Sequence, residues 1–160
     1  MHTRPAVPAD AAHIAAIYNQ GIADRSATFE VRPRSEADIR EWFAGKHPVI
    51  VVEADEKVVA FAASSSYSPR FCYAGIAEVS VYVARDFRGR GAGRMALEAL
   101  IAAAHTVGFW KLVSRIFTEN AVSRRLVASL GFREVGIYKR HAQLDGVWRD
   151  VVIVEKLIPG

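Results

Sequence analysis

Residues 77–109 constrain the fold most strongly, because a β-rich run, a turn crowded with glycine and arginine, and a long helical run follow one another there. The run AEVSVYVA alternates as a strand does, and GRMALEALIAAAHTVGF has the apolar spacing of a helix that stops at Gly108. Between them lies RDFRGRGAGR, with four arginines and three glycines. The first amides of a helix can hold phosphate oxygens, and glycine lets an anion approach the backbone closely. We therefore expect a strand–turn–helix unit that binds a phosphate-bearing ligand.

The rest of the chain predicts three further helices and six further strands around this unit. Apolar residues at helical spacing indicate helices over 9–24, 35–46 and 120–132. β-Branched runs and turn signals indicate strands over 2–7, in the two arms of a hairpin over 49–67, over 111–117, and in a second hairpin over 133–144 and 148–157. The sequence thus predicts one domain over residues 1–160, a mixed α/β (α+β) fold with a twisted mixed sheet of about seven strands and about four helices.

Local signals mark where these elements begin and end. We expect Asp10 to cap the first helix, Ser35 and Asp38 to cap the second, and Asn120 to cap the last. Residues 25–33, RSATFEVRP, are irregular and predict a loop. The Asp-Gly dipeptide inside the last pair of strands is a hairpin signal.

Composition indicates the number of domains and the cellular compartment, but says little about the chemistry. The 160 residues suit one domain, and the formal net charge of +4 favours anionic ligands only weakly. The single cysteine, Cys72, excludes an internal disulfide and is typical of a reducing compartment. The first ten residues have no apolar core of a signal peptide, and no apolar run approaches the ~18 residues of a membrane span. We expect a cytoplasmic protein with no membrane partner.

Several kinds of site can be weighed on the residues alone. The third glycine of a dinucleotide-binding fingerprint is replaced by Arg94, and the P-loop pattern is absent. The five histidines have no ligand spacing, so no metal is predicted. A solvated basic turn is the plain alternative for the arginine-rich stretch, and no nucleic-acid-binding motif accompanies it. No nucleic-acid partner is therefore expected.

The stretch from Arg88 to Gly93, RGRGAG, matches the [Q/R]-x-x-G-x-[G/A] signature of the GCN5-related N-acetyltransferases (the GNAT superfamily). The segment NAVSRRLVASLGF resembles the asparagine–helix–Gly-Phe segment of that family. Further stretches, among them IYNQGI, ATFE, EVSVYV and DGVWRDVVIVE, are similar to the branch that contains phosphinothricin, methionine sulfone/sulfoximine and arsinothricin N-acetyltransferases. The resemblance spans residues 4–157. It implies the GNAT fold, acetyl-CoA as cosubstrate, and a substrate pocket close to a homodimer interface.

The resemblance also implies a binding surface for acetyl-CoA. In the branch, strand residues after the catalytic carboxylate pair their backbone with pantetheine, and the glycine-rich loop holds the pyrophosphate. Asn120 would contact the pantetheine arm, with Ser123 nearby, although Asn120 is also explained as a helix cap. The residues that the resemblance assigns to the strand and loop contacts are Val81, Tyr82, Val83, Arg88, Gly89, Arg90, Gly91, Ala92, Gly93 and Arg94.

Glu78 is the expected general base, because a carboxylate at a strand end can take a proton from a substrate ammonium directly or through water. Branch members carry glutamate at this position. The acceptor amine would lie against residues of the irregular loop and of the two strands near Glu78. The residues expected there are Thr28, Phe29, Glu30, Arg70, Tyr73, Glu78, Val79 and Ser80.

The sequence departs from the branch on the acceptor side. The usual Arg-x-Arg reads Ser68-Pro69-Arg70, the Tyr-Arg pair reads Tyr73-Ala74, and Val79 stands where a histidine often follows the glutamate. These changes argue against strong phosphinothricin activity. Val127 stands where many relatives have a tyrosine that protonates the CoA thiolate, and a thiol pKa near ~8.5 makes that proton a modest need.

The expected activity is therefore transfer of acetyl from acetyl-CoA to the α-amino group of a small amino-acid analogue by direct attack. Two alternatives stay open at this point: a protein N-terminal or polyamine acetyltransferase, and a non-catalytic CoA-binding module. The expected partners are a small-molecule amine and a second copy of the chain.

Overall fold

The computed structural model describes residues 1–159 and contains one seven-stranded sheet in the order β1-β2-β3-β4-β5-β7-β6. β4 and β5 are parallel, and every other neighbouring pair is antiparallel. The strands are β1 His2–Pro5, β2 Val49–Ala54, β3 Lys57–Ser66, β4 Ile76–Val83, β5 Lys111–Phe117, β6 Arg133–Leu144 and β7 Val147–Leu157. The predicted order of helices and strands, and the mixed α/β fold, are confirmed.

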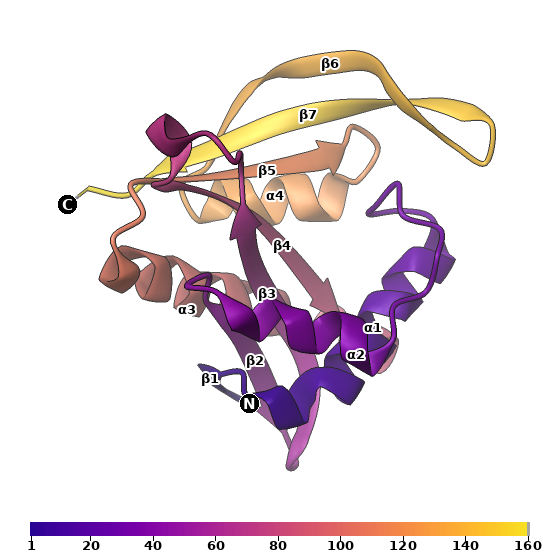
Figure 1. Ribbon diagram of the computed structural model, residues 1–160. Coiled ribbons are helices and arrows are strands. Elements are labelled where there is room, and N and C mark those ends of the chain that lie inside the picture. The colour runs from indigo at the N-terminus through magenta and orange to yellow at the C-terminus, as the bar shows by residue number, and fades with distance from the viewer. Residues whose placement is uncertain (160) are drawn as a thin grey trace.

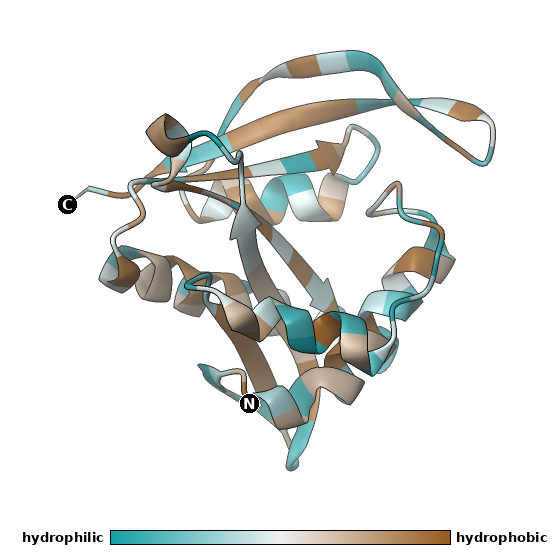
Figure 2. Cartoon of the chain, viewed as in Figure 1, coloured by the Kyte–Doolittle hydropathy of each residue, from teal (hydrophilic) through white to brown (hydrophobic). Residues whose placement is uncertain are grey.

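The helices lie in two layers, one on each face of the sheet (Figure 1). They are α1 Ala11–Asp24, α2 Glu36–Arg40, α3 Ala92–Val107 and α4 Ala121–Ser129. α1 and α2 pack on one face, where Ile14 and Ile39 meet Phe61 of β3. α3 and α4 pack on the other face, where Leu97 and Val127 share a core with Val152. In Figure 2 the strands between these layers are largely brown, as expected for strands buried on both faces.

The predicted helix signals are confirmed in most places. The Ser35 hydroxyl accepts from the Asp38 amide at 3.1 Å, and the Asp38 carboxylate accepts from the Ser35 amide at 2.9 Å. Gly108 ends α3 with φ of 106°, a left-handed conformation that glycine adopts without a Cβ clash. The second helix is shorter than predicted, because α2 changes to a 3₁₀ turn over Glu41–Ala44.

Asp10 occupies the N-cap position of α1 as predicted, but its side chain does not cap the helix. Its carboxylate makes no capping bond to α1 and instead accepts from the Val7 amide at 2.8 Å and from both terminal nitrogens of Arg4 at 2.8 and 2.9 Å. The strong bidentate acceptance from Arg4 engages the oxygens that would otherwise cap the helix. Asp10 thus ties β1 to the start of α1.

β4 and β5 pair over three residues and then part. The ladder joins Ile76 with Lys111, Ala77 with Leu112 and Glu78 with Val113, and no pair follows these in residues 1–159. β4 stays paired with β3 on its other side as far as Val83. Beyond Glu78, the edge of β4 that faces β5 therefore has backbone groups with no partner strand.

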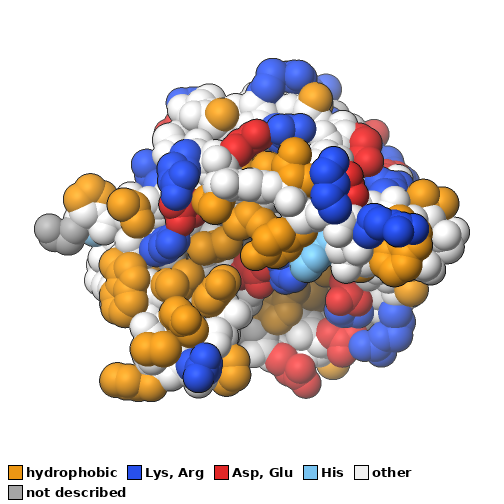
Figure 3. Space-filling view, turned by 90° about the horizontal axis from the view of Figure 1, so that it is seen from above, with side chains coloured by type: hydrophobic (Ala, Val, Ile, Leu, Met, Phe, Trp, Pro, Cys, Tyr) orange, Lys and Arg blue, Asp and Glu red, His pale blue; other side chains and the backbone are white. Residues whose placement is uncertain are grey.

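The β6–β7 hairpin extends along one side of the molecule (Figure 1). It turns at Asp145 and Gly146, both left-handed, which confirms the predicted Asp-Gly turn. β6 is an edge strand, and its residues 133–141 are all exposed. Seen from the side of this hairpin, hydrophobic side chains gather in groups separated by arginines and lysines (Figure 3).

Candidate active site

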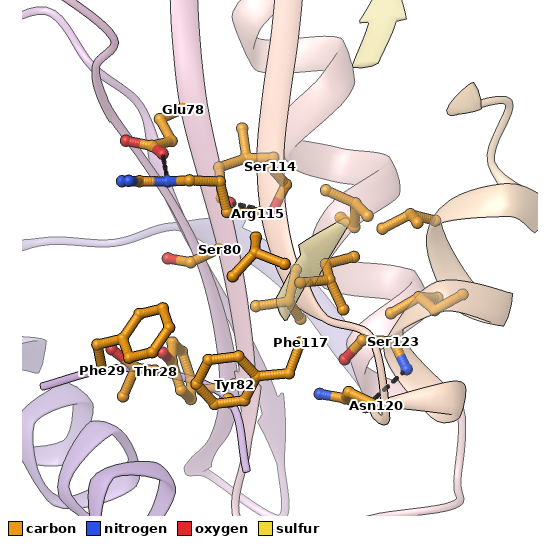
Figure 4. Close-up of a pocket in the computed structure, with 18 of the residues that line it drawn as sticks. Thr28, Phe29, Glu78, Ser80, Tyr82, Ser114, Arg115, Phe117, Asn120 and Ser123 are labelled. Carbon is orange, nitrogen blue, oxygen red and sulfur yellow. Dashed lines mark hydrogen bonds and ion pairs between the residues drawn. The ribbon is translucent and has the colours of Figure 1, made fainter. Parts of the chain in front are cut away.

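A cavity of about 500 Å³ lies where β4 and β5 part. Its walls come from the separating strands, the irregular loop after α1, and the start of α4 (Figure 4). Of the residues that the sequence predicts for the site, the cavity brings together Thr28, Phe29, Glu30, Glu78, Val79, Ser80, Val81, Tyr82, Asn120 and Ser123.

Glu78 and Arg115 form an ion pair in this cavity. Arg115 Nε donates to Glu78 Oε1 at 2.6 Å, and the two side chains point toward one another from neighbouring strands (Figure 4). The Glu78 side chain is 24% exposed and the Arg115 side chain is 54% exposed. The pair therefore lies at the open side of the cavity, where a ligand can reach both groups.

A buried hydrogen bond holds the point where the strands part. The Ser114 hydroxyl of β5 donates to the Val79 carbonyl of β4 at 2.9 Å. This bond joins the two strands immediately after their ladder ends at Glu78. It fixes the apex of the opening without closing it.

Two tyrosines form an apolar floor beside the strand β4. The rings of Tyr18 and Tyr82 lie 5.0 Å apart, and burial raises the pKa of each phenol above its ordinary value. A Cβ on Gly21 would lie 2.6 Å from the Tyr82 ring, so glycine is needed for α1 to pack there. Both hydroxyls are consequently protonated and neutral around pH 7.

The glycine-rich loop lies directly beyond the end of β4. Gly89 and Gly91 are left-handed with φ of 79° and 85°, and a Cβ at Gly93 would lie 3.3 Å from Val83. The first amide of α3 that bonds back into the chain is that of Met95, to the Gly91 carbonyl. Within residues 1–159 the amides of residues 92–94 have no acceptor, as at the start of any helix, and are left for a ligand.

The arginines of this loop are less available than the sequence suggests. Asp24, the last residue of α1, accepts from Arg85 at 2.7 Å and from Arg88 at 2.8 Å. The hydrogen bond from Arg85, followed by that from Arg88, holds the pKa of the Asp24 carboxyl below its ordinary value. Arg94 pairs with Glu98 at 2.9 Å, and Arg90 stacks over the Phe87 ring at 5.0 Å. Backbone amides, rather than unpaired arginines, are the main free donors of the loop.

Asn120 lies at the opposite wall of the cavity, at the start of α4. Its side-chain oxygen accepts from the Ser123 amide at 3.1 Å, which confirms the predicted cap. Its side-chain nitrogen donates to the Ser26 carbonyl at 3.3 Å and so joins α4 to the loop after α1. Phe29 of that loop packs edge-on against Phe117 at 4.8 Å.

The remaining predicted site residues do not line the cavity. Val83 and residues 88–94 lie at and beyond the end of β4, next to the cavity rather than in its wall. Arg70 and Tyr73 lie on the exposed connection between β3 and β4, where Tyr73 packs on Tyr67. Their expected place near the acceptor stays a prediction.

Sequence reasoning missed Arg115, the strand residue that reaches Glu78. One signal was present: Arg115 is a charged residue in the interior of β5, followed by the apolar Ile116 and Phe117, in KLVSRIF. Placing it beside Glu78 requires the neighbourhood of β4 and β5 in the sheet, which no local pattern gives.

Residues 1–159 contain no cluster of metal-binding side chains and no membrane-spanning helix. No group of three or more histidine, cysteine, aspartate or glutamate side chains in this range could hold a metal ion. No helix within it is long and apolar enough to cross a membrane.

Comparison with family models matches residues 15–132 to the acetyltransferase (GNAT) family. A putative phosphinothricin acetyltransferase of Bacillus subtilis is 33% identical, covering 96% of this chain and 97% of its own length. An L-methionine sulfoximine/L-methionine sulfone acetyltransferase of Pseudomonas paraeruginosa is 32% identical, covering 95% of this chain and 91% of its own.

Solved structures agree with the fold. A putative acetyltransferase from Salmonella typhimurium, determined with acetyl-CoA, has a TM-score of 0.96 and 29% identity, covering 100% of this chain and 95% of that one. A ribosomal-protein-alanine N-acetyltransferase from Brucella melitensis has a TM-score of 0.94 and 31% identity, covering 99% of this chain and 100% of that one.

Proposed function

The chain belongs to the acetyltransferase (GNAT) family and is an N-acetyltransferase, and we propose that it moves acetyl from acetyl-CoA to the α-amino group of a small amino acid. Phosphinothricin, arsinothricin, methionine sulfone and methionine sulfoximine are the acceptor types proposed. One arrangement carries this proposal: a carboxylate, Glu78, lies in a cavity that opens between two parting strands. The glycine-rich start of α3 lies beside that cavity.

The residues along this opening suit acetyl-CoA. The amides of residues 92–94 and the positive end of the α3 dipole would hold the pyrophosphate, since helix starts favour anions. The unpaired edge of β4 from Val81 to Val83 would bond the amides of pantetheine as a partner strand would. Asn120 and Ser123 would close the other side. Bound acetyl-CoA would supply a thioester carbon for attack by the amine.

Glu78 is proposed to take the proton that the acceptor ammonium must lose before its nitrogen attacks. Arg115 engages Oε1, and Oε2 has no donor from the chain within residues 1–159. One oxygen of the base is thus ready to accept from the ammonium. A nitrogen–carbon bond then forms, the carbon–sulfur bond breaks, and CoA leaves as a thiolate. Val127 supplies no proton to it.

A homodimer is proposed on the exposed apolar residues of the β6–β7 hairpin. Ile137 and Tyr138 of β6 and Trp148 of β7 are each about half exposed, on an edge strand that is free to pair. Unpaired edges with apolar residues favour association. Sedimentation of the purified protein would test this separately from activity.

A protein N-terminal acetyltransferase is the second candidate, favoured by the likeness to the Brucella melitensis enzyme. A peptide acceptor needs an open groove. The loop after α1 partly covers the cavity here, because Asn120 and Phe117 hold Ser26 and Phe29. This covering favours a small acceptor over a peptide.

The test is release of CoA thiol from acetyl-CoA by the wild-type protein and by Glu78→Gln. The acceptors are the four compounds named above, the common amino acids, an alanine-terminated peptide and spermidine. We expect turnover of an amino acid and a loss of about a hundredfold or more in kcat for Glu78→Gln. Turnover of only the peptide or spermidine would overturn the proposed acceptor class. Unchanged turnover in Glu78→Gln would remove Glu78 as the base.

A further inference from the structure

Arg115 is the only cationic side chain that lines the cavity in residues 1–159. The other charged side chains of the lining are Glu30 and Glu78. Glu30 is already paired with Arg34, outside the lining, at 2.9 Å. Glu78 and Arg115 therefore form the one place in the wall where a negative and a positive group stand side by side.

Both Glu78 and Arg115 keep hydrogen-bonding groups that the chain does not use within residues 1–159. Arg115 uses Nε alone toward Glu78, and its two terminal nitrogens bond no acceptor of the chain over residues 1–159. A guanidinium has five donors in a fixed planar fork, so the outward edge of Arg115 presents the geometry that a carboxylate accepts. The free oxygen of Glu78 is an acceptor beside it.

We propose that Arg115 binds the acid group of the acceptor while Glu78 binds its ammonium group. This inference rests on the proposed function and names the residue that selects for amino acids over other amines. An α-amino acid carries an ammonium and a carboxylate group on the same carbon. The Glu78–Arg115 pair presents the two complementary charges side by side. When the zwitterion binds, Glu78 and Arg115 each gain an oppositely charged partner on the ligand.

Placement favours Arg115 over Arg70 for this task. Arg115 lines the cavity and is 2.6 Å from the proposed base, whereas Arg70 is on the exposed connection between β3 and β4. An acid group bound by Arg115 would leave the α-nitrogen next to Glu78.

Amines without an acid group are disfavoured by the same arrangement. Their ammonium competes with Arg115 for Glu78, and Arg115 gains no anion in return. Such an amine therefore makes one charge-assisted contact, whereas an amino acid makes two. Decarboxylated amines and spermidine are therefore expected to be poor acceptors.

The experiment compares kcat/KM for three acceptors: the amino acid that the wild-type protein acetylates best, its carboxamide and its decarboxylated amine. Arg115→Ala, Arg115→Lys and Arg70→Ala are measured beside the wild type. Arg133→Ala is the matched control, because Arg133 is an exposed partner of Glu155 outside the cavity. Circular dichroism and acetyl-CoA affinity verify that each variant is folded.

We expect wild-type preference for the amino acid over both neutral derivatives, and a selective loss of about 10- to 100-fold for the amino acid in Arg115→Ala, mostly in KM. Arg115→Lys keeps the charge but loses the fork, so it should recover part of the preference. Arg115→Ala also frees Glu78, and this effect is shared by all three acceptors, whereas carboxylate binding is not.

Three outcomes would overturn the inference. An equal loss for all acceptors in Arg115→Ala would leave Arg115 as a positioning residue for Glu78 only. A selective loss in Arg70→Ala instead would assign the acid group to Arg70. Both leave the acetyltransferase intact. If the wild-type protein acetylates no amino acid, the proposed function fails and the inference fails with it.

Discussion

Two carboxylate–guanidinium pairs in this molecule, Asp10–Arg4 and Glu78–Arg115, differ in how many hydrogen bonds their carboxylates accept from the chain. Asp10 is buried, with 8% of its side chain exposed, and accepts two bonds from Arg4 and one from the Val7 amide. Glu78 lies at the cavity, accepts one bond from Arg115, and keeps one oxygen free. Glu53 also accepts from Arg4, so the first pair belongs to a closed cluster.

Only the Glu78–Arg115 pair has groups that residues 1–159 leave free to bind another partner. Removing Asp10 would take its carboxylate from two nitrogens of Arg4 and from the Val7 amide, so that pair holds β1 and the start of α1 together. Removing Arg115 would leave Glu78 in contact with solvent, so that pair has little to lose in folding. Pairs that are exposed on one side contribute little to stability and are free to bind a ligand.

The largest change in stability is expected for Asp10→Ala. The free energy of unfolding should fall by about 2–3 kcal/mol, because a guanidinium and an amide lose their acceptor. Chemical denaturation monitored by circular dichroism measures the change. Activity per folded molecule should be retained, since Asp10 is not in the cavity lining.

The matched control is Glu36→Ala, which breaks the exposed Arg40–Glu36 pair on α2. It should change stability by less than about 0.5 kcal/mol. An equal loss of stability in Glu78→Gln and Asp10→Ala would break the contrast, because both pairs would then be structural.

Acid should distinguish the wild type from Asp10→Asn by a smaller amount. The hydrogen bonds from Arg4 hold the pKa of Asp10 below its ordinary value of 3.8. A carboxyl group with a lowered pKa in the folded state adds stability above its unfolded pKa and loses it as pH falls through the folded one. The melting temperature of the wild type should thus drop more steeply than that of Asp10→Asn below about pH 4. Parallel melting curves down to pH 2 would contradict this.

The smallest of these effects is expected at Asp24. Its carboxylate accepts from two guanidinium groups, as that of Asp10 does from one, but Arg85 and Arg88 are exposed. Asp24→Asn should cost less than about 1 kcal/mol in stability. It would also free two guanidinium groups near the start of α3, and acetyl-CoA should bind about two- to threefold more tightly at low salt. The gain should vanish in concentrated salt. Weaker binding would mean that Asp24 orders the loop.

The fold was predictable because its signals are local. The β4–α3 unit, the Ser35–Asp38 cap and the stop at Gly108 can each be read within a few residues. The capping prediction failed at Asp10 because the competing donor, Arg4, reaches it from a strand.

The site was only partly predictable for the same reason. Glu78 and its neighbours on β4 follow from one strand and a family signature. Arg115 and Asp24 acquire their meaning from partners 37 and 61 residues away, through sheet order and helix packing. Charge pairs between distant segments leave no periodic trace in the sequence.

The parting of β4 and β5 bears on how such an enzyme can diverge. The point where the opening begins is set by the end of the β4–β5 ladder at Glu78 and by the Ser114–Val79 bond, which involves no side chain of residues 25–30 or Arg115. If Arg115 and residues 25–30 hold the acceptor as proposed, substitutions there would change the accepted amine and leave the β4–β5 opening as it is. Selection could then retune such a protein toward a new amine one side chain at a time, at positions that do not set where the two strands part.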